Sequence, residues 1–271
     1  MEVVDALKGI LSELSGAVVA YSGGVDSALL ADVAHEVLGE RMLAVTAVSA
    51  SLDPSERETA AALAAERGWA HREVRTDELE TAEYRANGPD RCYHCKNALL
   101  DRLEDLARAR GAVVLIGANA DDADDFRPGM RAAAERGARA PLLEAGMTKA
   151  DVRMAARARG LRAWDKPAAA CLASRIAYGV EVTAERLERV ARAEEFVRAL
   201  GARDVRVRDQ DNLARIEVPA SEVPRLADPA VAARMVSYLK ELGFHYVTLD
   251  LEGFRSGSMN VPLLSVSRIR S

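Results

Sequence analysis

The sequence predicts an α/β protein: a doubly wound, mostly parallel sheet followed by a smaller α+β domain. Three observations predict it. Short apolar, β-branched runs alternate with helix-length segments over roughly the first 165 residues, a composition break follows at Trp164–Gly179, and the elements after the break come in a different order. We therefore expect a first domain at 1–179 and a small α+β domain at 180–271.

The first domain should alternate strands with helices. The strands are expected at Val18–Tyr21, Leu43–Val48, His71–Arg75 and Val113–Gly117. The helices are expected near 26–38, 55–67, 92–110 and 148–159. Ligands of such sheets bind beyond the carboxyl ends of the strands. The segments that follow three strands should therefore face one crevice: Ser22–Ser27, Ala47–Asp53 and Gly117–Asp125.

The segment Trp164–Gly179 is expected to be irregular, and the second domain follows it. Its elements should be a helix from the cap Thr183 to about Leu200, strands at Asp204–Arg208 and Ala214–Val218 joined by a turn at Asp211-Asn212, a helix near 228–242 ended by Gly243, and a strand at Tyr246–Leu249. This order is typical of a small α+β domain, without an internal repeat.

Composition excludes several classes of protein. Of 271 residues, 49% are hydrophobic and 29% charged, as in a soluble globular protein. No apolar stretch of about 20 residues and no basic-plus-apolar leader is present, so we expect no membrane partner and a cytoplasmic location. The net charge of −5, with both signs mixed throughout, argues against a nucleic-acid partner.

The segment Tyr21–Ser27 joins a predicted strand to a predicted helix and has the composition of a phosphate-binding loop. Gly23 and Gly24 can bring backbone N–H groups close to an anion, and the helix that follows points its positive end at the same place. Ser22 and Ser27 add hydroxyl donors, and Asp26 can hold Mg²⁺ or cap the helix. The loop contains no lysine, so it is not a Walker A loop. The alternative is an ordinary glycine-rich turn.

The three cysteines indicate metal or sulfur chemistry. Cys92 and Cys95 are spaced to share one helix face, and Cys171 follows in the irregular segment. Three converging thiolates suit a [4Fe–4S] cluster that leaves one iron open, able to hold sulfide. Zinc, with His94 as a fourth ligand, and a plain dithiol are the alternatives.

Two other groups of charged residues are candidate ligand contacts. Arg206 and Arg208 share one face of a predicted strand, where paired guanidinium groups suit a phosphate, and Arg255 is a candidate third contact. The alternative is a solvated strand face. An acidic cluster after the strand at Val113–Gly117 can bind Mg²⁺ or form a charged loop; its members are Asp121, Asp122, Asp124 and Asp125.

The chain resembles the ATP-dependent sulfur transferase LarE family of the PP-loop ATP pyrophosphatases. The matching segments are Ser22–Ser27, Asp125–Gly129, Cys171–Gly179, Val205–Arg208, Ala214–Glu217, Phe244–Asp250 and Gly253–Gly257. The first segment marks only the superfamily, and the later ones are specific to this family.

The resemblance implies a two-step reaction in the synthesis of the nickel-pincer nucleotide cofactor of lactate racemase. ATP adenylates a carboxylate of pyridinium-3,5-biscarboxylic acid mononucleotide, and sulfur then displaces AMP. Some members sacrifice a cysteine that matches Cys171 and leave dehydroalanine. Others use three cysteines to hold a [4Fe–4S] cluster, an arrangement that Cys92, Cys95 and Cys171 match.

The resemblance also assigns roles. Ser22, Gly23, Gly24, Asp26 and Ser27 should bind ATP and Mg²⁺, with Asp26 and Cys171 catalytic. Asp122 and Asp125 are candidate Mg²⁺ ligands, Arg206 and Arg208 should bind the substrate phosphate, and Arg175, Glu217 and Arg255 should border the pocket. The partners implied are a small mononucleotide and further copies of the chain. A tRNA thiolase and a non-catalytic nucleotide-binding protein are the rival hypotheses.

Overall fold

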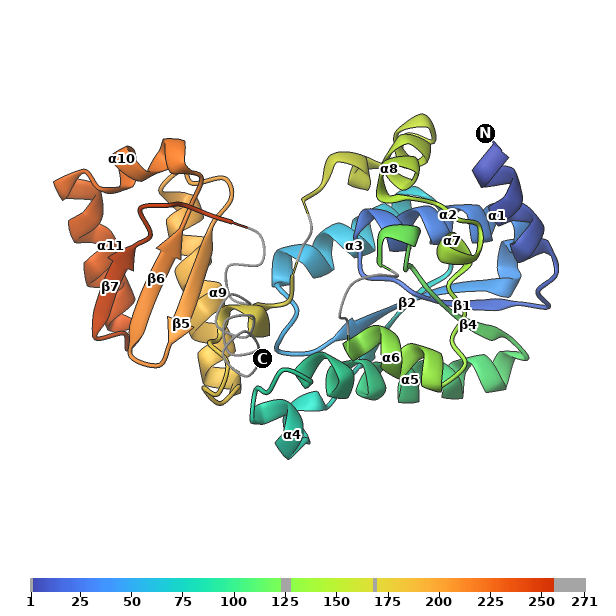
Figure 1. Cartoon of the computed structure of the whole chain (residues 1–271), viewed down its shortest axis with the longest axis horizontal. Coiled ribbons are helices and arrows are strands. Elements are labelled where there is room, and N and C mark those ends of the chain that lie inside the picture. The colour runs from blue at the N-terminus through green and yellow to red at the C-terminus, as the bar shows by residue number, and fades with distance from the viewer. Residues whose placement is uncertain (1, 123–127, 168–169, 256–271) are drawn as a thin grey trace, which may run out of the picture. The chain divides into compact units, whose positions relative to one another are not determined.

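The computed structural model describes residues 2–122, 128–167 and 170–255, and Figure 1 shows the course of the chain. The chain forms two compact units. The first comprises Met1–Tyr84 and Pro89–Ala170, and the second comprises Arg85–Gly88 and Cys171–Ser271. The functional division expected at 179/180 stays a prediction. Within the described part of the chain, no helix is both long and apolar enough to cross a bilayer.

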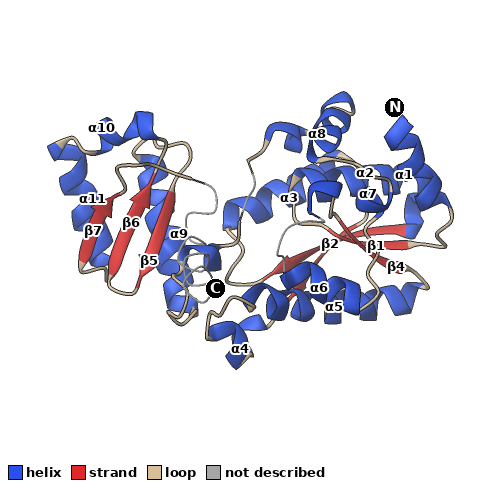
Figure 2. Ribbon diagram, viewed as in Figure 1, coloured by secondary structure: helices blue, strands red, loops and turns tan. Residues whose placement is uncertain are grey.

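The first unit contains the expected parallel sheet (Figure 2). Its strands are β1 (Ala17–Ala20), β2 (Met42–Val48), β3 (His71–Arg75) and β4 (Val113–Ile116), in the order β3-β2-β1-β4. All neighbouring pairs are parallel, with Val18 opposite both Leu43 and Val114. The predicted fold class is therefore confirmed, and β1 ends next to the glycine-rich loop.

Helices cover both faces of this sheet. In chain order they are α1 (Glu2–Ser12), α2 (Val25–Leu38), α3 (Pro54–Glu66), α4 (Ala82–Arg85), α5 (Arg91–Arg110), α6 (Pro128–Glu135), α7 (Pro141–Glu144) and α8 (Lys149–Ala158). Helices α1, α4, α6 and α7 were not predicted from the sequence. Buried Leu7 of α1 and Leu142 of α7 belong to the main core, so tertiary packing stabilises short or glycine-containing helices that propensity alone does not favour.

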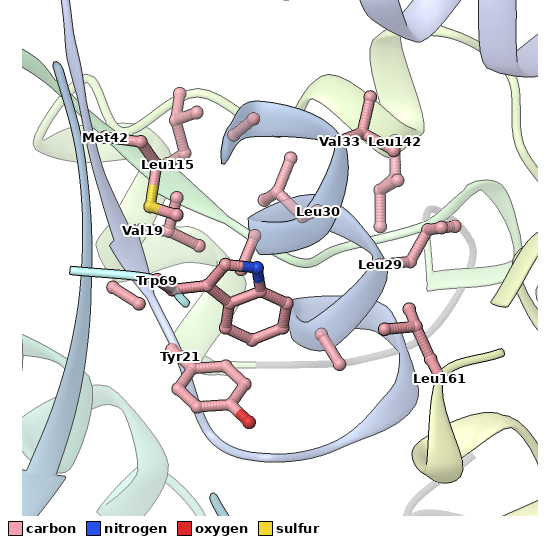
Figure 3. Packing of buried hydrophobic residues seen from close by; sticks show 14 of the residues in the cluster. Val19, Tyr21, Leu29, Leu30, Val33, Met42, Trp69, Leu115, Leu142 and Leu161 are labelled. Carbon is pink, nitrogen blue, oxygen red and sulfur yellow. The ribbon is translucent and has the colours of Figure 1, made fainter. Parts of the chain in front are cut away.

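The core divides at the sheet because successive strand residues point to opposite faces. Val19 joins the cluster that α1, α2 and α8 cover, whereas Val18 joins the cluster beneath α5. Figure 3 shows the first cluster, where the Tyr21 and Trp69 rings meet edge to face with centroids 5.4 Å apart. The burial of α2 on this face fixes the helix whose first turn forms the loop.

The second unit is a separate small α+β fold. Its elements are α9 (Ala184–Ala199), β5 (Arg206–Gln210), β6 (Leu213–Glu217), α10 (Val223–Leu226), α11 (Pro229–Glu241) and β7 (Tyr246–Leu249). β5 and β6 pair antiparallel through the predicted turn, where Asp211 has φ 66°, and β7 adds parallel to β6. Its core contains Val207, Ile216 and Phe244.

A four-residue segment, Arg85–Gly88, leaves the first unit and joins the second. Asn87, fully buried and with φ 55°, fastens it there. Its side-chain amide donates to the carbonyls of Ile176, Ala177 and Val180 at 3.3, 2.8 and 2.9 Å. The chain therefore passes between the units at three points, and Cys92 and Cys171 each lie shortly after one of them.

Candidate functional site

The glycine-rich loop runs from β1 into α2. Gly23 has φ 73°, and a Cβ there would lie 2.9 Å from the Cβ of Ala60 in α3. The Ser22 backbone N–H donates to Ser27 Oγ at 3.2 Å, the two hydroxyl oxygens lie 3.1 Å apart, and Ser27 Oγ donates to the Gly24 carbonyl at 3.1 Å. The two serines predicted as phosphate donors thus also hold the loop in shape.

Asp26 lies in the first turn of α2 and faces two side chains that the sequence analysis missed. Its Oδ1 accepts from Asn119 Nδ2 at 3.0 Å, and its Oδ2 lies 2.5 Å from Lys149 Nζ. The helix cap is Gly24, with no side-chain cap, so Asp26 does not take the capping role considered for it. The amide and the ammonium group hold the Asp26 carboxylate beside the glycine-rich loop, where it could bind a Mg²⁺ ion.

The acidic loop after β4 is tied to the same place. Asp121 Oδ2 accepts from the Lys149 backbone N–H at 3.0 Å, and Asp122 Oδ2 accepts from the Asn119 N–H at 3.1 Å. Asp121 therefore joins this loop to the start of α8, whose Lys149 side chain contacts Asp26, and Asp122 closes the loop on Asn119, whose side chain also contacts Asp26. Asp124 and Asp125 lie outside the described residues, and a role of Asp122 in binding Mg²⁺ stays a prediction.

Gly117 sets how closely β4 approaches the loop. A Cβ at Gly117 would lie 2.8 Å from the backbone nitrogen of Ser27 and 3.1 Å from the carbonyl carbon of Asp26. The first turn of α2 therefore packs directly on the end of β4. This contact brings the loop, Asn119 and the acidic loop together.

The segment after β2 takes part in a buried hydrogen-bonded cluster. Ser51 Oγ donates to Glu78 Oε1 at 2.9 Å and lies 3.0 Å from the Tyr84 hydroxyl. Nearby, burial lowers the pKa of His71, whose Nε2 lies 2.9 Å from Thr46 Oγ1. These hydrogen bonds join the segments that follow β2 and β3 and connect the two strands to each other.

Cys92 and Cys95 lie in the first two turns of α5, with Cys92 exposed and Cys95 half-buried. Burial lowers the pKa of Lys96, and negative charge on Cys95 and Cys92 would oppose that shift. His94 Nε2 lies 3.3 Å from Asp90 Oδ2, so it faces a carboxylate of its own helix start. None of the three cysteines is in a disulfide, and Cys171, exposed, belongs to the second unit.

Cys171 precedes a short 3₁₀ turn at Leu172–Arg175, where an irregular segment was expected. Its carbonyl accepts from Arg175 Nη1 at 3.1 Å, and Arg175 Nε donates to the buried carboxylate of Glu194 at 2.9 Å. Searched across its described residues, the chain has no group of three His, Cys, Asp or Glu side chains that could hold a metal ion. The convergence of the three sulfurs stays a prediction.

The arginines of β5 have different partners although the sequence makes them look alike. Arg208 is buried and its Nη2 lies 2.7 Å from Glu217 Oε2, while Nη1 donates to the Ser174 carbonyl at 3.2 Å. Arg208 and Glu217 thus form an internal ion pair. Exposed Arg255 pairs with Glu252 at 2.6 Å.

Arg206 has no carboxylate partner among the residues the structure describes. Its Nη1 donates to the Val205 carbonyl at 2.8 Å, and its guanidinium carbon lies 5.1 Å from the Phe254 ring centroid. Burial, and then the positive charge of Arg175, lower the pKa of Arg206. A half-buried cation with no carboxylate paired to it among the described residues is a good place for an anionic ligand.

Comparison with known proteins gives the family. The NAD synthase family model matches residues 2–121. An uncharacterized Synechocystis protein is 48% identical over 95% of this chain and 96% of its own length. The pyridinium-3,5-bisthiocarboxylic acid mononucleotide synthase of Lactiplantibacillus plantarum is 41% identical over 94% of this chain and 92% of its own length.

The chain belongs to the LarE family.

A more distant relative, an uncharacterized protein of Methanocaldococcus jannaschii, is 28% identical over 88% of this chain. The predicted resemblance is thus confirmed, and the family-model match covers the part of this LarE-family chain that contains the loop, Asp26 and Asn119.

Sequence reasoning missed three residues whose side chains contact the loop of this LarE-family chain: Asn119, Lys149 and Lys166. Asn119 comes two residues after Gly117, a position that the crevice rule could have singled out. Lys149 follows Thr148, which forms a capping box with Asp151. That signal places the lysine at a helix start. No local signal links Lys166 to the loop, because its side-chain contacts lie more than a hundred residues away in sequence.

Proposed function

We propose that this chain is an ATP-dependent sulfur transferase that converts carboxylates of pyridinium-3,5-biscarboxylic acid mononucleotide into thiocarboxylates, for the nickel-pincer nucleotide cofactor. The observation that carries the proposal is the 41% identical relative, which matches 94% of this chain and whose name states the bisthiocarboxylic acid product. The loop Ser22–Ser27, placed between a parallel strand and a buried helix, supports the use of ATP.

The first step is adenylation. The substrate carboxylate attacks the α-phosphorus of ATP, the bond from that phosphorus to the bridging oxygen breaks, and pyrophosphate leaves. The first-turn N–H groups of α2 and the bent backbone at Gly23 would bind the phosphates. Asp26 would hold Mg²⁺, which offsets negative charge on the departing pyrophosphate. Adenylation gives the carboxylate AMP as a good leaving group.

The substrate's own phosphate should bind in the second unit. Arg206, without a carboxylate partner among the described residues, is the first candidate. Arg208 would add positive charge near the phosphate without touching it, because it stays paired with Glu217. Because Arg208 is internal, we expect it to hold the strand and the pocket edge, whereas Arg206 supplies the direct contact.

The second step replaces AMP by sulfur. We propose Cys92, Cys95 and Cys171 as the ligands of a [4Fe–4S] cluster. The donor set suits such a cluster, because none of the three cysteines is in a disulfide and Cys92 and Cys95 lie one helical turn apart. Held by three thiolates, such a cluster keeps one iron open for the sulfide that is transferred.

The alternative sulfur source is Cys171 itself. Its thiolate would attack the acyl adenylate and expel AMP. Loss of the Cα proton of Cys171 to a base, with cleavage of the Cβ–S bond, would then release the thiocarboxylate product and leave dehydroalanine in the protein. Exposure of Cys171 suits either role. The two sources differ in stoichiometry, because a consumed cysteine supplies one sulfur per chain.

The deciding experiment follows product and protein together after anaerobic purification and reconstitution. We expect about four iron and four acid-labile sulfide per chain, pyrophosphate release that depends on the pyridinium substrate, and an unchanged protein mass after turnover. Loss of one H₂S from the protein, with little iron, would favour sacrificial Cys171. No substrate-dependent pyrophosphate release would favour a non-catalytic nucleotide-binding protein, and tight, salt-dependent tRNA binding would favour a tRNA thiolase.

The matched control is Cys92→Ser. If the cluster carries the sulfur, this variant should bind little iron and make no thiocarboxylate, although pyrophosphate release persists. If Cys171 is sacrificed, Cys92→Ser should still transfer one sulfur per chain.

A further inference from the structure

We propose that Lys149 and Lys166 are the phosphate-binding cations of the ATP site, each brought to one end of the loop Ser22–Ser27 from a segment far along the chain. This inference rests on the proposed function and names the side chains that hold the triphosphate. In a Walker A loop the cation is a lysine of the loop itself. Here the loop has none, and the fold supplies two.

Lys149 reaches the α2 end of the loop. It is the first residue of α8, and its Nζ lies 2.5 Å from Asp26 Oδ2. Its backbone N–H donates to Asp121 at 3.0 Å, which fixes the position from which the side chain extends. The Lys149 and Asp26 side chains are 35% and 21% exposed, so an entering ligand can reach this ion pair.

Lys166 reaches the β1 end of the loop. Its Nζ lies 2.6 Å from Glu56 Oε2 and 3.5 Å from the carbonyl oxygen of Gly23. Glu56 lies in the first turn of α3, and Gly23 is the residue whose positive φ bends the loop. The side chain of Lys166 is 17% exposed, so this ammonium is better shielded from water than that of Lys149.

The charges around the loop explain why both lysines are needed. Two carboxylates, Asp26 and Glu56, flank a segment that has to accept a highly anionic triphosphate. Without counter-charges they would repel it, and the N–H groups of α2 supply only a partial positive charge. Each lysine neutralises one carboxylate before ATP arrives. An ammonium on a flexible stem can then turn to a phosphate oxygen without movement of its helix.

A purely structural role makes a different prediction. If Lys149 and Lys166 only hold Asp26 and Glu56 in place, their loss should lower the affinity for every ligand of the site equally and lower the melting temperature of the protein. If they bind phosphate, their loss should lower the affinity for a nucleoside triphosphate and leave the affinity for the nucleoside unchanged. The length of the phosphate chain is therefore the readout that separates the two roles.

The experiment measures the affinity of the full-length chain for α,β-methylene-ATP with Mg²⁺ and for adenosine. The variants are Lys149→Met and Lys166→Met, with Lys8→Met as the matched control, because Lys8 pairs with Glu36 on the outer surface of α1 and α2. We expect each site variant to lose about tenfold or more in affinity for the analogue, as for a charged hydrogen bond, with adenosine affinity and melting temperature near those of the control.

Unchanged affinity for the analogue, or an equal loss for adenosine, would overturn the proposal. If a Met variant does not fold, the Gln variant of the same lysine carries the comparison. The outcomes also separate this inference from the proposed function. A wild-type chain that binds the analogue through the lysines but makes no thiocarboxylate would refute the sulfur transfer alone. Normal sulfur transfer by both lysine variants, with unchanged affinity, would refute the lysine assignment alone.

Discussion

Replacement of Gly117 by alanine tests how closely β4 and α2 must approach. The new Cβ would lie 2.8 Å from the Ser27 nitrogen, 3.0 Å from Ser27 Cα and 3.1 Å from the Asp26 carbonyl carbon. All three are backbone atoms, so no side chain can rotate away. Either the strand end or the first turn of α2 has to shift.

The magnitude follows from this geometry. Overpacking of this kind lowers the free energy of unfolding by about 1–3 kcal/mol. In a unit of this size, that corresponds to a fall in melting temperature of about 2–4 °C for each kcal/mol. Because the shift displaces the N–H groups that bind phosphate, we expect ATP affinity to fall as well, by about tenfold or more for each charged hydrogen bond that is lost.

The assay is thermal unfolding together with titration of an ATP analogue. The matched control is Gly9→Ala in α1, where an added Cβ meets nothing within 4 Å. That variant should gain about 0.5–1 kcal/mol, since alanine is the better helix former. Gly117→Ala with wild-type melting temperature and ATP affinity would falsify the argument that this contact positions the loop.

Three further predictions have distinct expected outcomes. Arg208→Met should lower the free energy of unfolding by about 1.5–3 kcal/mol, because it removes the Nη2 contact with buried Glu217, which keeps Arg215 as a partner. Arg206→Met should leave urea unfolding nearly unchanged and lower the affinity for the mononucleotide substrate about tenfold, without lowering the affinity for ATP. Equal effects of the two variants in substrate titration and urea unfolding would contradict the assignment. Burial lowers the pKa of His71, so the unfolded chain binds the proton first as the pH falls, and the free energy of unfolding should decrease below about pH 6.5. The melting temperature should depend less on pH in His71→Gln than in the wild type. An equal slope in the two proteins would exclude His71 as the cause. Asn87→Gly allows the same backbone φ but removes three donated hydrogen bonds. The free energy of unfolding measured in urea should therefore fall by about 2–4 kcal/mol. An unchanged free energy of unfolding would mean that the backbone conformation alone holds the segment Arg85–Gly88.

The sequence predicted what local patterns encode. The alternation of strands and helices, the position of the loop and the turn at Asp211 depend on neighbouring residues, and all three are present. The start of β5 at Arg206, two residues later than predicted, is an ordinary uncertainty of element ends.

The partners of charged side chains could not be predicted in the same way. Arg206 and Arg208 alternate identically along the strand, yet Glu217, on the neighbouring strand, pairs with Arg208 and not with Arg206. Likewise Asp26 meets Lys149, 123 residues away in sequence. Such pairs depend on which segments the sheet and its crossovers bring together, and periodicity carries no information about them.

The anchoring of Asn87 has a consequence for how this chain is synthesised. The three carbonyls that its amide reaches follow it in the sequence by 89, 90 and 93 residues. At a translation rate of about 5–20 residues per second, those acceptors leave the ribosome roughly 5–20 s after the asparagine. During that interval the polar groups of the segment Arg85–Gly88 remain in water, while strands β1, β2 and β3, which precede it in the sequence, can already pair. A nascent chain stalled before residue 176 should therefore leave this segment open to protease, and completion of the chain should close it.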